Sequence, residues 1–155
     1  MNARKFWICV LTAACFVLLG TNAPAQAADA LAVVVSGESP LKNIKLVDLK
    51  KVFLLEVGEV PGTKLRLKLL TMPEKSAAQQ IALDAVYAMG AVDLKKVWLK
   101  KVFKNEIAAE PKAVDSAKSL ADAIGDEPGY VGYCLASEVP EGLVVVKVDG
   151  KSPGE

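Results

Sequence analysis

The stretch that decides the fold runs from residue 31 to residue 53 and reads LAVVVSGESPLKNIKLVDLKKVF. It begins with a continuous apolar run, Leu31-Ala-Val-Val-Val-Ser36, which is typical of a strand buried on both faces of a sheet. Gly37 and Pro40 then mark a loop. The next apolar residues recur at helical spacing, at Leu46, Leu49, Val52 and Phe53. The stretch therefore predicts a strand, a loop and an amphipathic helix over 46–55.

The same alternation of strands and helices continues to residue 148. Hydrophobic periodicity predicts strands over 65–71, 130–135 and 143–148, and helices over 75–89, 93–103 and 116–124. Two capping boxes compete for the start of the second helix, Thr71 with Glu74 and Ser76 with Gln79. We expect an α/β fold with a mixed, mainly parallel sheet flanked by about four helices. The last two strands are expected to form an antiparallel edge.

The N-terminus has the three parts of a secretory signal peptide. Arg4 and Lys5 form a short basic region, residues 6–20 are apolar and uncharged, and Ala25-Gln26-Ala27 is an A-x-A cleavage site. The apolar run is shorter than the roughly 20 residues of a membrane-spanning helix. We expect cleavage after Ala27, a periplasmic location and no membrane span after cleavage; the alternative is an uncleaved anchor. The expected organisation is a signal peptide over 1–27, one domain over 28–150 and a tail over 151–155.

The composition excludes several classes of function. A chain of 155 residues fits one domain, and a hydrophobic fraction of 52% is too high for a disordered protein. The formal net charge of +1 gives no field that would recruit nucleic acid. No histidine is present, which excludes histidine-based triads and His-ligated zinc. Because no nucleophile elbow, Walker loop or dinucleotide motif occurs, we expect a non-catalytic protein without cofactor or metal.

Three stretches together resemble the periplasmic phosphate-binding protein family, in particular its short, single-domain, secreted relatives. The helix ending Leu49-Lys-Lys-Val-Phe53 is similar to the family's helix of leucine, two polar residues, isoleucine and phenylalanine. The strand over 65–71 leads through a short turn into a helix opening at Ser76. Residues 128–133, Pro-Gly-Tyr-Val-Gly-Tyr, are similar to the family's P-G-x-I-G-Y turn into a strand. The likeness spans about residues 31 to 148 and implies a single solute-binding-protein-like lobe, whereas full-length transport receptors have two.

The resemblance implies a small oxyanion, such as phosphate, held weakly at helix N-termini, with a membrane transporter or sensor as partner. Free N–H groups and the positive end of the helix dipole favour an anion there. By position, the ligand-binding residues are Ser76 at the second helix and Ser36, Gly37 and Ser39 in the first loop. The alternative is a periplasmic protein-interaction or accessory module on the same fold, without small-molecule binding.

The sequence departs from the family pattern at this site. The family's serine-glycine-threonine run is Ser76-Ala77-Ala78 here, its nearby arginine is replaced by Lys75 alone, and Glu38 adds a negative charge to the first loop. Each candidate also has a purely structural interpretation, since Ser76 can act as a helix cap and residues 36–39 as a turn. We therefore expect weak affinity.

Several other residues are expected to have structural roles. Cys134 lies in an apolar strand pattern and is expected to be a small buried residue. Phe53, Trp98 and Phe103 are expected in the core. Five lysines cluster on the helix over 93–103 and just beyond it, at Lys95, Lys96, Lys100, Lys101 and Lys104. They form either a solvated face opposite Trp98 or a docking face for an acidic partner or anionic headgroups.

Overall fold

The structure is a computed structural model that describes residues 30–125 and 127–155, and the predicted signal peptide lies outside them. Its centre is a six-stranded sheet with the order β2-β6-β1-β5-β3-β4. The strands are β1 (Leu31–Ser36), β2 (Asn43–Ile44), β3 (Lys68–Thr71), β4 (Lys112–Ala113), β5 (Tyr130–Leu135) and β6 (Leu143–Val148). The sheet is mixed, as predicted. Both edge strands, β2 and β4, are two-residue segments that the sequence pattern does not predict.

The direction of β1 is the main difference from the predicted topology. β1 pairs antiparallel with β5 on one side and with β6 on the other, whereas the remaining pairings are parallel. Among the described strands, β1 alone therefore runs against the other five. The prediction that β5 and β6 form an antiparallel edge pair is wrong, because β1 lies between them and both point the same way. Residues Ala32 to Val35 are almost fully buried, as their apolar run predicts.

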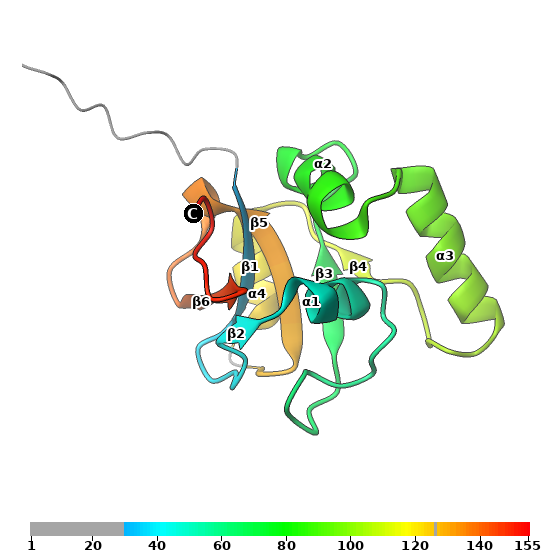
Figure 1. Ribbon diagram of the computed structural model, residues 1–155, viewed down its shortest axis with the longest axis horizontal. Coiled ribbons are helices and arrows are strands. Elements are labelled where there is room, and N and C mark those ends of the chain that lie inside the picture. Colours follow the sequence, from blue (N-terminus) through cyan, green and yellow to red (C-terminus); the bar gives the residue numbers. More distant parts are fainter. Residues whose placement is uncertain (1–29, 126) are drawn as a thin grey trace, which may run out of the picture.

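Helices cover both faces of the sheet (Figure 1). They are α1 (Leu46–Phe53), α2 (Ala77–Ala82) with the π-helical turn η1 (Leu83–Tyr87), α3 (Ala91–Phe103) and α4 (Ala117–Ile124), and a 3₁₀ turn follows β5 at Ala136–Glu138. Gly132 of β5 faces α4, since a Cβ there would lie 2.5 Å from Cδ1 of Leu120. The next residue, Tyr133, points to the opposite face, where it stacks on Phe53 of α1 with ring centroids 5.0 Å apart. α4 thus packs on one face and α1 and α2 pack on the other.

The second helix shows how local sequence sets the boundaries of an element. Of the two predicted caps, Ser76 is the one used, because its Oγ accepts a hydrogen bond from the Gln79 N–H at 3.2 Å. The helix widens into η1 and ends at Ala88, which has a left-handed φ of 53°. Gly90 begins α3 instead of ending the preceding helix.

The remaining predictions divide between the core and the surface. Phe53 and Cys134 are fully buried, as predicted, and burial raises the pKa of the Cys134 thiol to about 11. Phe103 is 83% exposed, so its predicted place in the core is wrong.

Residues 151–155 fold back on β6, because the N–H groups of Val148 and Lys151 each donate to the other residue's carbonyl at 3.0 Å. Within the described residues, no helix combines the length and apolar character needed to cross a bilayer.

Candidate functional site

The four residues predicted to bind a ligand lie at opposite ends of the sheet. Val35 of β1 and Leu69 of β3 both align with Val131 of β5, one on each side of that strand. From that level the chain leaves the sheet in opposite directions, to Ser36 after β1 and through Thr71 to Ser76 after β3. Figure 1 shows the loop that follows β1 at the end of the sheet away from α2. The structure therefore brings Ser36, Gly37 and Ser39 together, but it separates them from Ser76.

At the first end, the serine hydroxyls are used inside a turn. Ser36 and Ser39 are both 1% exposed. Ser36 Oγ accepts from the Glu38 N–H at 3.3 Å, and Ser39 Oγ accepts from the Leu41 N–H at 3.3 Å. The Ser39 N–H donates to the Ser36 carbonyl at 3.0 Å, and the Gly37 carbonyl accepts from Lys42 Nζ at 3.2 Å. These groups stabilise the loop, and because both serines are almost fully buried, their hydroxyls are not open to a ligand arriving from solvent.

At the second end, Ser76 is a cap whose hydroxyl is committed on both sides. Its Oγ donates to the Pro73 carbonyl at 2.8 Å while accepting from the Gln79 N–H. The same hydroxyl proton cannot also be given to an anion. The side chain therefore fixes the start of α2, and any ligand beside it must be bound by neighbouring groups.

Such groups line a cavity of about 140 Å³ between the carboxyl end of β3, α2 and α3, which we call the β3–α2 pocket. Its walls are formed by Thr71, Met72, Glu74, Gln79, Ala91, Leu94, Lys95, Trp98, Glu110, Pro111 and Ala113. This volume is enough for a few water molecules or one small ligand.

Two buried side chains bring hydrogen-bond donors to the β3–α2 pocket. Gln79 is 4% exposed, and its Oε1 accepts a hydrogen bond from the Tyr133 hydroxyl, which assigns the donor group Nε2 to the other end of the amide. Trp98 is 8% exposed, and its Nε1 is buried without a hydrogen-bond partner among the described residues. An indole N–H can only donate, and a buried donor without a partner costs about 1–3 kcal/mol. The side chain that carries this unused donor is one of those that line the pocket.

A chain of aromatic rings holds these donors in place. The rings run from Tyr133 through Phe53 and Tyr87 to Trp98, with successive centroids 5.0, 5.4 and 6.0 Å apart. Burial is the main cause that raises the pKa of Tyr133 to about 12 and also raises the pKa of Tyr87. Tyr133 therefore remains a neutral donor to Gln79 at physiological pH and fixes the orientation of its amide.

The charges lining the β3–α2 pocket are mixed. Lys95 provides one positive charge, and Glu74 and Glu110 provide two negative charges. Lys95 makes no ion pair among the described residues, so its ammonium group is available to a ligand. The two carboxylates oppose binding of a multiply charged anion, which is consistent with the weak affinity expected from the sequence.

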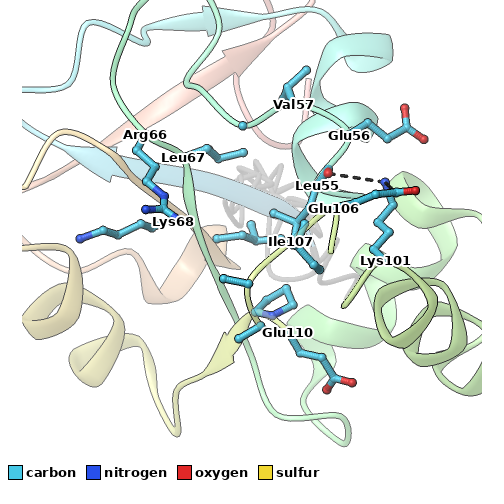
Figure 2. Close-up of a pocket in the computed structure, with 15 residues that line it drawn as sticks. Leu55, Glu56, Val57, Arg66, Leu67, Lys68, Lys101, Glu106, Ile107 and Glu110 are labelled. Atoms are coloured by element: carbon cyan, nitrogen blue, oxygen red, sulfur yellow. Dashed lines mark hydrogen bonds and ion pairs between the residues drawn. The ribbon is translucent and has the colours of Figure 1, made fainter. Parts of the chain in front are cut away.

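A second and larger cavity, of about 650 Å³, lies beside the amino-terminal half of β3 (Figure 2). Figure 2 shows Leu67 pointing toward Ile107, whereas Arg66 and Lys68 lie on the opposite side of the strand. Lys68 pairs with Glu127 at 3.0 Å, and Lys101 donates to the Leu55 carbonyl at 3.5 Å. Because these two cations already have partners and three carboxylates, Glu56, Glu106 and Glu110, also line the cavity, it suits a small anion less well than the β3–α2 pocket does.

The sequence analysis missed the donors that the structure brings together. Gln79 was considered only as part of a capping box, and Trp98 only as a core residue. Trp98 is buried as predicted, but only half of the capping box forms, because the Gln79 side chain bonds Tyr133 and the Ser76 N–H donates to the Pro73 carbonyl. A useful signal was available, because tryptophan and glutamine carry polar groups that need partners when they are buried.

Comparison with known proteins supports the fold and no finer assignment. No protein-family model matches the sequence, and no curated protein is detectably similar to it. Among solved structures, an ABC-type phosphate transport receptor from Vibrio cholerae superposes with a TM-score of 0.62 at 13% identity, over 81% of this chain and 48% of the receptor. A phosphate ABC transporter substrate-binding protein from Clostridium perfringens with bound phosphate superposes with a TM-score of 0.63 at 17% identity, over 80% of this chain and 46% of that protein. PstS from Borrelia burgdorferi superposes with a TM-score of 0.58 at 21% identity, over 81% of this chain and 49% of PstS.

The chain spans about half the length of these solved structures. At these identities the match is one of fold, and it agrees with the resemblance seen in the sequence. The described residues thus form a single α/β lobe with the fold found in phosphate ABC transporter substrate-binding proteins.

Proposed function

We propose that the protein is a periplasmic, non-catalytic solute-binding protein that binds a small oxyanion such as phosphate in the β3–α2 pocket. The observation that carries this proposal is the buried indole N–H of Trp98, which has no partner among the described residues and belongs to a side chain that lines the pocket. An oxyanion offers several strong acceptors at once, and hydrogen bonds to a charged group are stronger than those to a neutral one.

The neighbouring side chains support an anion as the ligand. Gln79 can donate only through Nε2, because its Oε1 is occupied by Tyr133. Lys95 adds a positive charge to the lining. The fold neighbours are phosphate receptors and substrate-binding proteins of ABC transporters. By analogy we include a membrane transporter or sensor as the partner.

The single tryptophan of the exported chain makes this proposal easy to test. The sequence has two tryptophans, Trp7 within the predicted signal peptide and Trp98 in the pocket. After cleavage at Ala27, intrinsic fluorescence would therefore report on the pocket alone. We expect a saturable change in Trp98 emission on titration with millimolar phosphate or sulfate, and no change with chloride at the same ionic strength.

Calorimetry provides the matched comparison, because it does not depend on the fluorophore. Trp98→Phe should weaken phosphate binding, whereas Ser39→Ala, at the other end of the sheet, should leave it unchanged. Absence of both heat and fluorescence change with every oxyanion at millimolar concentration would refute the proposal.

A further inference from the structure

The outer face of α3 carries an unusual stripe of exposed apolar side chains. Val92 is 69% exposed, Leu99 is 38% exposed and Phe103 is 83% exposed. Their spacing of seven and four residues places them within about 40° of one another around the helix, at roughly 100° per residue. Phenylalanine exposed to this extent beside other apolar residues is characteristic of a contact surface.

The stripe is free because α3 packs through its other side. Leu94 and Trp98 face inward and are buried. Figure 1 shows α3 at one end of the molecule, with no other helix or strand beyond it. A flat surface can therefore approach the stripe without obstruction from the rest of the fold.

Lysines flank the stripe on both sides. At helical spacing, Lys96 and Lys100 lie on one flank, and Lys95, which also lines the β3–α2 pocket, lies on the other. The nearby acids are already paired, Asp93 with Lys96 at 3.0 Å and Glu106 with Lys101 at 3.9 Å and Lys104 at 3.7 Å. Lys95 and Lys100 make no ion pair among the described residues. The face is thus positively charged, which favours an anionic partner and disfavours a second copy of the same face.

We propose that this face of α3 binds the surface of an anionic lipid bilayer. The apolar stripe would enter the boundary between headgroups and acyl chains, and the flanking lysines would contact lipid phosphates. Amphipathic helices with lysines beside a narrow apolar face bind membranes in this way, lying about 5–10 Å deep in the interface. A convex helix at the end of a molecule fits a plane directly, whereas a protein partner would have to supply a matching groove.

The test uses the exported protein, whose mass is checked first, because the apolar residues 6–20 would insert into lipid by themselves. Sedimentation with vesicles is measured for phosphatidylglycerol mixed with phosphatidylcholine and for phosphatidylcholine alone. We expect binding to the anionic vesicles only, weakened steeply by salt.

Substitutions at exposed residues distinguish binding through the apolar stripe from non-specific binding to vesicles. Phe103→Ser should reduce partitioning onto anionic vesicles by about tenfold or more, and Leu99→Ser by less, because Leu99 exposes less apolar surface. Val47→Ser is the matched control, since Val47 is 65% exposed on α1, and this variant should bind as the wild type does. Val47 and Phe103 are mostly exposed, so thermal unfolding of these two variants should be close to that of the wild type.

Three outcomes would overturn the proposal. The first is that the wild type does not bind anionic vesicles at low salt, which would leave the face to an acidic protein. The second is equal binding to neutral vesicles. The third is that Phe103→Ser behaves like Val47→Ser.

Discussion

The two ends of the sheet differ in whether their buried polar side chains have hydrogen-bond partners within the described residues. Where β1 ends, Ser36 and Ser39 are buried and their hydroxyls accept hydrogen bonds from the loop itself. Where β3 ends, Gln79 and Trp98 are equally buried, but the Trp98 N–H has no partner among the described residues. Serines in a loop are therefore a weaker indication of a binding site than a buried donor that the protein itself leaves unused.

The first expected effect is on protein stability, at the end of the sheet where β3 leads into α2. Gln79→Leu removes the acceptor of the buried Tyr133 hydroxyl, and an unsatisfied buried group costs about 1–3 kcal/mol. We expect the free energy of unfolding to fall by this amount in urea denaturation. Gln80→Leu is the matched control, because Gln80 is exposed, and its loss should stay below about 0.5 kcal/mol. Equal losses in the two variants would show that the buried hydrogen bond does not matter.

The next effect sharpens the contrast by separating binding from stability. Trp98→Phe removes a donor to the anion worth about 1.5–3 kcal/mol, so phosphate affinity should fall by roughly ten- to hundredfold. Its cost in stability comes from lost packing against Tyr87 and not from a lost hydrogen bond, because the N–H has no partner among the described residues. Ser39→Ala should do the reverse, lowering stability by about 1 kcal/mol through the orphaned Leu41 N–H without changing affinity. Calorimetry measures the phosphate affinity of both variants, and urea denaturation measures their stability. Equal affinities in the two variants would contradict the prediction.

A third effect concerns pH. Burial raises the pKa of Tyr133 to about 12, above the value of about 10 in the unfolded chain. Between these values the unfolded chain loses a proton that the folded protein keeps, so stability falls as pH rises, by about 1.4 kcal/mol per unit. Buried Tyr87 and Cys134 titrate with the same sign. The quantity to measure is therefore the difference in slope between the wild type and Tyr133→Phe from pH 10 to 12. Identical slopes would contradict the assigned burial.

The smallest effect is on the charge balance of the pocket. Glu74→Gln removes one of the two carboxylates that line it, and an interaction of about 1 kcal/mol at 4 Å in water corresponds to a severalfold gain in phosphate affinity. Glu141→Gln, far from the pocket lining, is the control for net charge. If both variants gained equally, the effect would be one of overall charge and not of the pocket.

Much of the fold could be predicted because its signals are local. The apolar run of β1, the helical spacing in α1 and α4, and the Ser76 cap each depend on a few consecutive residues. The direction of β1 could not be predicted, since an apolar run has no polarity and the pairing partners of β1 lie about 100 residues away. The edge strands β2 and β4 have two residues each, too few for any periodic pattern.

The site could be predicted only in part, for two physical reasons. α3 has two apolar stripes, one with Leu94 and Trp98 and one with Val92, Leu99 and Phe103, and spacing alone cannot tell which one is buried. Whether the indole N–H of Trp98 has a hydrogen-bond partner depends on which acceptors the folded chain brings near its Nε1. The sequence pattern does not show this. Ser76 and the groups of the β3–α2 pocket lie at the same end of the sheet, whereas Ser36, Gly37 and Ser39, assigned to that site by resemblance, lie at the other end because β1 runs antiparallel to β5.

The most direct test of the proposed binding site is the indole N–H resonance of Trp98 in a proton–nitrogen correlation spectrum of residues 28–155, the expected mature protein. This chain should show one indole signal, because Trp98 is the only tryptophan beyond residue 27. If the indole donates to a bound oxyanion, its proton resonance should shift downfield as phosphate is added, and the shift should saturate. Loss of the signal in Trp98→Phe confirms its assignment. An indole resonance that stays in place at millimolar phosphate, while chloride at equal ionic strength gives the same spectrum, would contradict binding in the β3–α2 pocket.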